Sequence, residues 1–205
     1  MQELEKMRAG KLYDTSEKQL AQMRLNAHKL CKDYNDTYED EEDKRKAILQ
    51  KLCPNLGKGT YLQGPLQFDY GVHFITGENC YANFNFTVLD CAPVTLGDDV
   101  FIGPNCQLVT PMHPLLIDER KIRFKQDGTP YDIEYAKPIV IGDGVWLASG
   151  VTVCGGVTIG KNSVIGAGSV VTRDIPEGVL AAGNPCKVIR KITEEDSVCL
   201  KKELL

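Results

Sequence analysis

The stretch IVIGDGVWLASGVTVCGGVTIGKNSVIGAGSVVT, residues 139–172, decides the fold because it repeats every six residues. Aliphatic residues occupy every sixth position, and a small residue follows each: Ile141-Gly142, Leu147-Ala148, Val153-Cys154, Ile159-Gly160, Ile165-Gly166 and Val171-Thr172. Six is a multiple of the two-residue strand period, so these aliphatic side chains face one side of an extended chain, whereas a helical period would scatter them. The small residues indicate a corner that the chain turns repeatedly. We therefore expect a coiled stack of short strands.

Two earlier tracts, Leu96–Val109 and less regularly Thr76–Leu89, carry the same period. A polar, proline-containing stretch at about 110–137 interrupts the repeat, and such interruptions commonly build functional sites. The expected organisation is an N-terminal helical segment (1–56), a coiled body (57–183) with an extruded active-site loop at about 110–137, and a C-terminal segment (184–205).

The N-terminal segment has helical spacing of apolar residues between Ser16 and Lys32, where Asp14 and Glu17 have the offset of a capping box. A second helix is expected at about Glu39–Leu52, with acidic residues at its start and Lys51 at its end.

The composition is that of a globular protein, with 42% hydrophobic and 25% charged residues among 205. The 28 acidic against 24 basic residues disfavour a nucleic-acid partner. No run of 18 apolar residues and no signal peptide is present, so a cytoplasmic protein without a membrane partner is expected. The eight cysteines form no CxxC pair and lie mostly in apolar stretches, which favours buried thiols over disulfides or zinc sites.

Several phrases outside the repeat point to a family: MRAGKLY at 7–13, FDYG at 68–71, YANFN at 81–85, HP at 113–114 and AGNPCKVIR at 182–190. Together with the six-residue period, they resemble the hexapeptide-repeat acyltransferases, in particular the maltose and galactoside O-acetyltransferase branch, over nearly the whole chain. The resemblance implies a mainly β fold, a left-handed parallel β-helix of about five coils of about eighteen residues. The left-handed sense comes from the family, because ordinary crossovers are right-handed.

The activity that the resemblance implies is transfer of acetyl from acetyl-CoA to a sugar hydroxyl, with no metal required. An alcohol needs a base to remove its proton, and histidine is the natural candidate. Of the three histidines, at 28, 73 and 113, His113 lies at the mouth of the extruded loop, where the resemblance places the family's base. Glu134 matches the carboxylate that orients this base, with the loop residues Asp118 and Glu119 as rivals.

The resemblance also assigns the binding residues. For the sugar acceptor these are Asp69, Tyr81, Asn83 and Asn85, while Cys91 departs from the acidic residue that family members carry and leaves the sugar's identity open. For acetyl-CoA they are Gly103, Trp146, Ser149, Ala167, Thr172, Lys187 and Arg190. The amide of Ser149 would stabilise the oxyanion, and the two basic residues would meet the phosphates.

A homotrimer with active sites between subunits is expected from the family. The alternatives are an acetyltransferase for another small acceptor, an amine or an antibiotic, and a non-catalytic solenoid scaffold. A zinc hydrolyase of the carbonic-anhydrase type is disfavoured, because its three clustered imidazoles are not matched by histidines at 28, 73 and 113.

Overall fold

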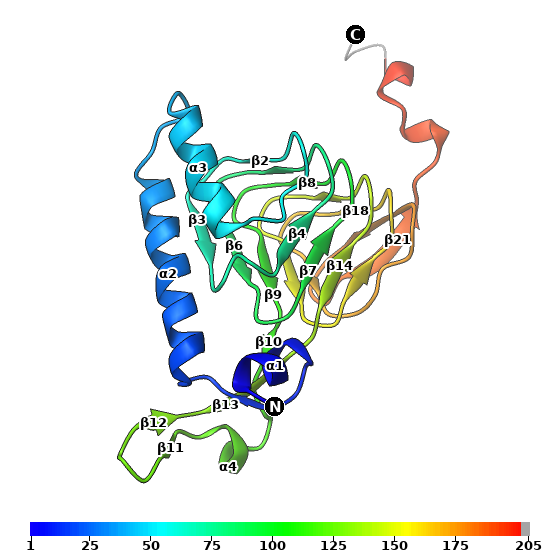
Figure 1. Cartoon of the computed structure of the whole chain (residues 1–205). Coiled ribbons are helices and arrows are strands. Elements are labelled where there is room, and N and C mark those ends of the chain that lie inside the picture. The colour runs from blue at the N-terminus through cyan, green and yellow to red at the C-terminus, as the bar shows by residue number, and fades with distance from the viewer. Residues whose placement is uncertain (202–205) are drawn as a thin grey trace.

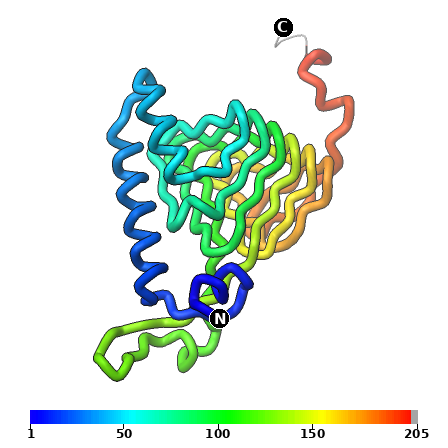
Figure 2. The backbone as a smooth tube through the Cα atoms, in the orientation of Figure 1, coloured from blue at the N-terminus to red at the C-terminus, as the bar shows by residue number. Residues whose placement is uncertain are grey.

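The computed structural model describes residues 1–201, which form a prism of short parallel strands with helices at one end and an extruded loop below (Figure 1). The backbone trace in Figure 2 shows the chain winding around the prism turn after turn, from cyan to orange. The fold is mainly β, as predicted.

Three parallel sheets form the faces of the prism. The first face contains β4 (Phe74–Thr76), β7 (Val94–Leu96), β14 (Ile139–Ile141) and β17 (Thr158–Ile159). The second contains β2 (Tyr61–Leu62), β5 (Tyr81–Ala82), β8 (Phe101–Ile102), β15 (Trp146–Leu147), β18 (Val164–Ile165) and β20 (Val179–Ala182), with β21 (Lys187–Lys191) added antiparallel. The third contains β3 (Leu66–Phe68), β6 (Phe86–Leu89), β9 (Gln107–Val109), β16 (Thr152–Cys154) and β19 (Val170–Val171).

The number of turns is about six rather than the five expected. Six parallel strands lie on the second face, and single bridges at Asn55–Ile75 and Ile159–Ile175 extend the first face at both ends. The first and last turns lack the regular pairs of aliphatic and small residues, so the repeat count missed them.

The six-residue period forms the core as predicted. The aliphatic residues at every sixth position from Ile141 to Val171 are all at most 1% exposed. The corners are as tight as the small residues indicate. A Cβ added at Gly142 would lie 2.7 Å from the Lys161 nitrogen, closer than real Cβ atoms approach.

Within residues 1–201, the α-helices outside the strands are α1 (Glu3–Arg8), α2 (Lys18–Asn35), α3 (Glu42–Leu52) and α4 (Ile117–Arg120). The capping box predicted between Asp14 and Glu17 is wrong. Glu17 is itself the N-cap of α2 and accepts from the amides of Gln19 and Leu20, whereas Asp14 accepts from Ser16. The second helix begins at Glu42, later than expected, because residues 38–41 form a turn closed by the Glu41 amide on the Tyr38 carbonyl.

The helices α2 and α3 cover the end of the prism at which the strands begin (Figure 1). Ala27, Cys31 and Tyr34 of α2 pack into the core of the first turns. Arg45 of α3 is buried and donates to the Tyr34 hydroxyl and to the carbonyls of Leu62 and Gln63. This cap satisfies groups that the open end of a solenoid would leave unpaired.

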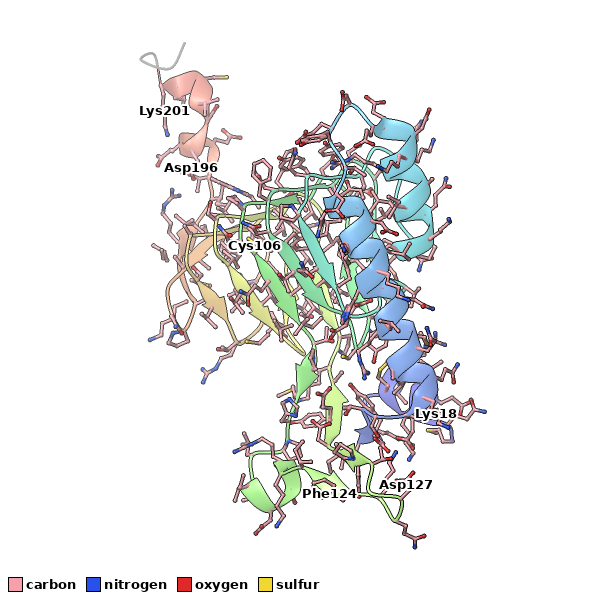
Figure 3. All side chains as sticks on the ribbon, turned by 90° about the vertical axis from the view of Figure 1, so that its left-hand side faces the viewer. Lys18, Cys106, Phe124, Asp127, Asp196 and Lys201 are labelled. Carbon is pink, nitrogen blue, oxygen red and sulfur yellow. The ribbon has the colours of Figure 1, made fainter. Side chains whose placement is uncertain are left out.

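The loop leaves the prism after β9 and returns before β14. It carries β10 (Pro111–Met112), α4, the hairpin of β11 (Arg123–Phe124) and β12 (Pro130–Tyr131), and then β13 (Ile133–Ala136). In Figure 3, Phe124 and Asp127 mark this loop, Lys18 at the start of α2 lies nearby, and Asp196 and Lys201 lie at the far end of the molecule. No helix among residues 1–201 is long and apolar enough to cross a membrane. All eight cysteines are free; Cys199 alone is exposed.

Candidate active site

A small antiparallel sheet at the base of the loop carries the candidate base. The strand β13 lies between β1 (Tyr13–Asp14) from the N-terminal segment and β10. Tyr13 pairs with Glu134, and Met112 pairs with Tyr135, so the next residue, His113, continues opposite Glu134. Side chains directly opposite on neighbouring strands share a face. The register therefore places Tyr13, Glu134 and His113 in one row across the sheet.

The same register aligns a second row two residues along β13. The Thr15 amide donates to the Asp132 carbonyl, and the Thr15 hydroxyl donates to Oδ1 of Asp132. Because side chains alternate along a strand, Asp132 and Glu134 face the same side. We call Tyr13, Thr15, His113, Asp132 and Glu134 the base cluster.

The imidazole of His113 lies between the two carboxylates. Its Nε2 is 3.5 Å from Oε1 of Glu134, and its Nδ1 is 3.8 Å from Oδ2 of Asp132. The His113 side chain is 47% exposed, whereas those of Asp132 and Glu134 are 22% and 18% exposed. An accessible imidazole backed by partly buried carboxylates can take a proton from a hydroxyl and be stabilised when charged.

Tyr13 holds Glu134 in place. Its hydroxyl donates to Oε2 of Glu134 at 2.8 Å, and the tyrosine is 2% exposed. Burial, together with the neighbouring Cys91 and Glu134, raises the pKa of Tyr13 far above its usual value. The phenol therefore stays protonated and remains a donor to the carboxylate.

The ligand atoms of His113, Asp132 and Glu134 lie within 4.8 Å of one another, a spacing that a metal ion could bridge. One oxygen of each carboxylate already accepts from a hydroxyl, that of Tyr13 for Glu134 and that of Thr15 for Asp132. One cavity of about 820 Å³ lies between α3 and the first turn. A second, of about 480 Å³, is lined by Pro114, Ile133 and Tyr135, the chain neighbours of the base cluster, but by none of the cluster's own residues.

Asp69 lies near the root of the loop. The strands β3, β6 and β9 are parallel neighbours, so Asp69, Asp90 and Thr110 follow their ends at one corner of the prism. The Cys91 thiol lies 3.5 Å from Oδ2 of Asp69 and donates to it. Burial, followed by the charge of Asp90, raises the pKa of Asp69. This predicted acceptor residue is thus on the same corner as the base cluster.

Asn83 and Asn85 lie at the opposite end of β6, in the turn that precedes it. A four-residue strand spans about 13 Å, so these side chains and His113 do not meet within one chain. Within the chain they support the corner: Oδ1 of Asn83 accepts from the Phe84 amide, and the Asn85 amide donates to Asn105 at 3.0 Å. Tyr81, on β5 just before this turn, stacks on Tyr61.

Several predicted acetyl-CoA residues share the corner with Asn83 and Asn85. Gly103 lies directly against Ser149 of the next turn: a Cβ added at Gly103 would lie 2.8 Å from the Ser149 nitrogen. On the other side of Ser149, its carbonyl accepts a hydrogen bond from the amide of Gly168, the residue after Ala167. We call the corner formed by Asn83, Asn85, Gly103, Ser149 and Ala167 the groove corner.

The other predicted acetyl-CoA residues lie apart. Trp146 is half-exposed on the second face, and Thr172 follows β19 at the end of the third. Lys187 and Arg190 lie on β21, where Arg190 binds Asp196 through two hydrogen bonds of 2.6 and 2.7 Å. A phosphate at Arg190 would therefore displace Asp196.

Comparison with known proteins agrees with this architecture. Residues 6–57 match the maltose acetyltransferase hexapeptide capping motif, and residues 138–173 match the bacterial transferase hexapeptide with six repeats. Galactoside O-acetyltransferase of Escherichia coli is 41% identical over 192 residues, covering 94% of this chain and 90% of that protein. The chain belongs to the hexapeptide-repeat acetyltransferases of the maltose and galactoside branch. The predicted resemblance and its left-handed β-helix are therefore confirmed.

Solved structures of this acetyltransferase family superpose over nearly the whole chain. A maltose O-acetyltransferase from Clostridium difficile 630 has a TM-score of 0.86 at 42% identity, covering 95% of this chain and 99% of its own. A galactoside acetyltransferase in complex with coenzyme A has a TM-score of 0.86 at 40% identity, covering 96% and 94%. A putative acetyltransferase of Saccharomyces cerevisiae is 44% identical over 195 residues, 95% of either chain.

Sequence reasoning missed three members of the base cluster: Tyr13, Thr15 and Asp132. The expected rivals of Glu134 lie elsewhere, since Asp118 is 85% exposed and binds Lys121. The sequence did contain one indication: Tyr13 and Thr15 are two residues apart, as are Asp132 and Glu134, so each pair would face one side of a strand. Without the pairing of β1 with β13, nothing in the sequence connects the two pairs.

Proposed function

We propose that this acetyltransferase moves the acetyl group of acetyl-CoA to a hydroxyl of a sugar, with His113 as the general base. The observation that carries the proposal is the row Tyr13–Glu134–His113, which presents an accessible imidazole held beside a partly buried carboxylate. The relatives named galactoside and maltose O-acetyltransferase, one with coenzyme A bound, support the acceptor and donor classes.

The reaction uses groups of the chain at each step. The acceptor hydroxyl gives its proton to the His113 imidazole while its oxygen attacks the thioester carbonyl. The amide of Ser149 stabilises the tetrahedral oxyanion. When the intermediate collapses, the carbon–sulfur bond breaks, and the leaving thiolate takes the proton from the imidazolium. The products are the acetylated sugar and coenzyme A.

The active site combines two chains in this proposal. The base cluster of one subunit faces the groove corner of the next in a homotrimer, since the two lie on different corners of one prism. Asp69, Tyr81, Asn83 and Asn85 contact the sugar, and Gly103, Trp146, Ala167, Thr172, Lys187 and Arg190 line the donor's path. Each subunit consists of three parts: a helical segment (1–56), a β-helical body (57–183) and a C-terminal segment (184–205). Its cysteines are free thiols, which is typical of cytoplasmic proteins, and we propose that location for the enzyme.

The decisive experiment replaces His113. We expect His113→Ala to lower the rate of coenzyme A release by about 10²- to 10⁴-fold, measured with acetyl-CoA and a panel of mono- and disaccharides. His28→Ala, at an exposed position of α2, is the control and should leave the rate unchanged. An unchanged rate in His113→Ala would show that another group is the base.

A further inference from the structure

We propose that the cavity between α3 and the first turn binds further sugar units of the acceptor, so that the enzyme prefers oligosaccharides to monosaccharides. The inference rests on the proposed function and adds to it a second binding site and a narrower substrate class. The observation behind it is a row of aromatic side chains that leads from Tyr81, a proposed sugar contact, to Tyr61 at the edge of the cavity.

The aromatic row lies on the outer side of the second face. The parallel register places four aromatic residues side by side on neighbouring strands: Tyr61, Tyr81, Phe101 and Trp146. The rings of Tyr61 and Tyr81 are stacked, with centroids 6.2 Å apart and planes 5° apart. Tyr61 is 39% exposed, and Phe101 is 54% exposed. The row is therefore an accessible apolar surface along which sugar rings can lie.

The order of the strands gives this row a direction. On the second face, β2 lies on one side of β5, whereas β8, β15 and β21 lie on the other. In the proposed function acetyl-CoA takes the latter side, with Trp146 on β15 and Arg190 on β21. A sugar at Tyr81 therefore has β2 as the free direction along the face. Neighbouring strands are about 4.8 Å apart, about the length of one pyranose unit, so the next unit reaches Tyr61.

The cavity beyond Tyr61 suits a neutral polar ligand. Its volume is about 820 Å³, within the range of about 300–1,000 Å³ that is usual for small-molecule sites. Two carboxylates and three cationic side chains line it: Glu39, Glu42, Arg45, Lys46 and Lys58. These opposite charges nearly cancel, and Gln50 and Thr60 add an amide and a hydroxyl. Many hydrogen-bonding groups with little net charge favour a polyhydroxylated ligand over an anion.

Arg45 supplies hydrogen-bond donors that are fixed in advance. Its side chain is buried, and its Nη2 donates to the Tyr34 hydroxyl and to the carbonyls of Leu62 and Gln63. Its Nε and Nη1 have no partner among residues 1–201, yet no fully buried side-chain nitrogen there lacks one. These N–H groups are therefore open to solvent where Arg45 lines the cavity. They can donate to sugar hydroxyls without moving.

The test compares acceptors of different length. The acceptors are methyl glycosides of one, two and three units of the same sugar, in a glucose and a galactose series. In the series that the wild-type enzyme acetylates, we expect kcat/KM to rise by about 10-fold from one unit to three, through a lower KM. One ring contact together with one hydrogen bond accounts for a preference of this size.

Removal of the Tyr61 ring should abolish the preference. In Tyr61→Ala we expect kcat/KM for the longest glycoside to fall about 10-fold, to the value for the monosaccharide. The KM for acetyl-CoA and the rate with the monosaccharide should change by less than about 2-fold. Tyr61→Phe, which keeps the ring, should restore the preference.

A second variant closes the cavity without touching Tyr81. Gln50 is an exposed residue of α3 that lines the cavity, so Gln50→Trp should lower kcat/KM for the longest glycoside alone. Ala47→Trp, at an exposed position of the same helix outside the cavity lining, is the matched control. Circular dichroism of each variant identifies any loss that is due to misfolding.

The opposing outcomes are distinct. Equal kcat/KM values for one and three units in the wild-type enzyme would overturn the inference and leave the proposed function intact. An equal loss on short and long acceptors in Tyr61→Ala, with no effect of Gln50→Trp, would also overturn it, because Tyr61 would then act only by supporting Tyr81. A wild-type enzyme that acetylates no sugar would instead overturn the proposed function.

Discussion

A buried phenol fixes the geometry of the base. Without the Tyr13 hydroxyl, Glu134 would lose the one donor that restrains it on the side away from His113. The tyrosine ring itself packs with Met7, Leu20 and Ala136 and would keep that packing in a phenylalanine variant. In the proposed mechanism the Tyr13 hydroxyl acts through Glu134, and its removal should disturb the packing of the fold little.

We predict that Tyr13→Phe lowers kcat by about 10-fold, because a hydrogen bond to a charged group contributes about 1.5 kcal/mol or more. The KM values for sugar and acetyl-CoA should change by less than about 2-fold, since Tyr13 is 2% exposed and out of reach of either substrate. Steady-state kinetics of the folded variant measure this, with Tyr38→Phe, 76% exposed, as control. A kcat equal to that of the wild type would contradict the role.

The ionised carboxylate of Asp69 lowers the stability of the folded protein near neutral pH. Burial and the nearby Asp90 raise its pKa above the ordinary 3.8, so the folded protein binds this proton more tightly than the unfolded chain. The stability that this proton contributes is complete below pH 3.8 and is lost as the pH rises through the raised pKa.

We therefore predict that Asp69→Asn raises the melting temperature near neutral pH, and that the gain disappears as the pH falls toward 4. Thermal unfolding between pH 4 and pH 8 measures it. Sugar acetylation should fall at the same time if Asp69 contacts the acceptor. A melting temperature that falls at neutral pH would contradict the burial argument.

At the scale of single residues, the sequence could predict those that lie in recognisable phrases. His113 stands beside Pro114 at the loop mouth, and Glu134 stands where the loop returns, so both were accessible to motif reasoning. Asp132 and Thr15 were not, because their positions depend on a pairing between segments 117 residues apart.

The corner of the coil is the element that brings together the predicted acetyl-CoA residues Gly103, Ser149 and Ala167. Gly103 and Gly142 occupy equivalent corners of different edges, and an added Cβ would meet backbone at 2.8 and 2.7 Å. In each case the obstructing atom is a main-chain nitrogen of the next turn. The two turns must therefore separate to admit a methyl group.

We predict that Gly103→Ala and Gly142→Ala both lower the free energy of unfolding by about 1–3 kcal/mol, the usual cost of overpacking. Only Gly103→Ala should also raise the KM for acetyl-CoA, because the residue it displaces is Ser149. Denaturant unfolding and steady-state kinetics test the pair. If both variants had the same KM for acetyl-CoA, Ser149 would not be part of the acetyl-CoA site.

The repeat was the most predictable element and the capping helices the least. Each aliphatic residue of 139–172 has its place set by its own six-residue unit, so local sequence suffices. Two acidic residues could have capped the start of α2. Glu17 caps the helix, whereas Asp14 binds Ser16 and Lys125 instead. Local offsets alone do not resolve such a competition.

At the scale of the whole molecule, the base cluster and the groove corner lie on different edges of the prism. In the proposed function, one chain therefore contributes to two different sites, and a homotrimer completes three. The sequence pointed to His113 and Glu134 of the first group and to the residues of the second, but the separation of the two groups in space appears only once the chain is wound.

We predict that two inactive variants restore each other when mixed. His113→Ala subunits retain the groove corner, and Asn85→Ala subunits retain the base cluster. After unfolding and refolding an equal mixture, about one quarter of the sites should be intact, if subunits combine at random in a cyclic trimer. Coenzyme A release and the mass in solution measure this. An absence of recovery in a confirmed mixed trimer would place both residues in one site of one chain.

The pairing of β1 with β13 has a consequence for biosynthesis. Tyr13 leaves the ribosome early, but its partner Glu134 follows 121 residues later. The nascent enzyme thus has to keep its first strand unpaired until about half of the parallel strands, β2 to β9, have been made. A truncated translation product that ends just before β13 could wind the first coils and would contain His113, yet it would lack Glu134, the carboxylate beside that imidazole.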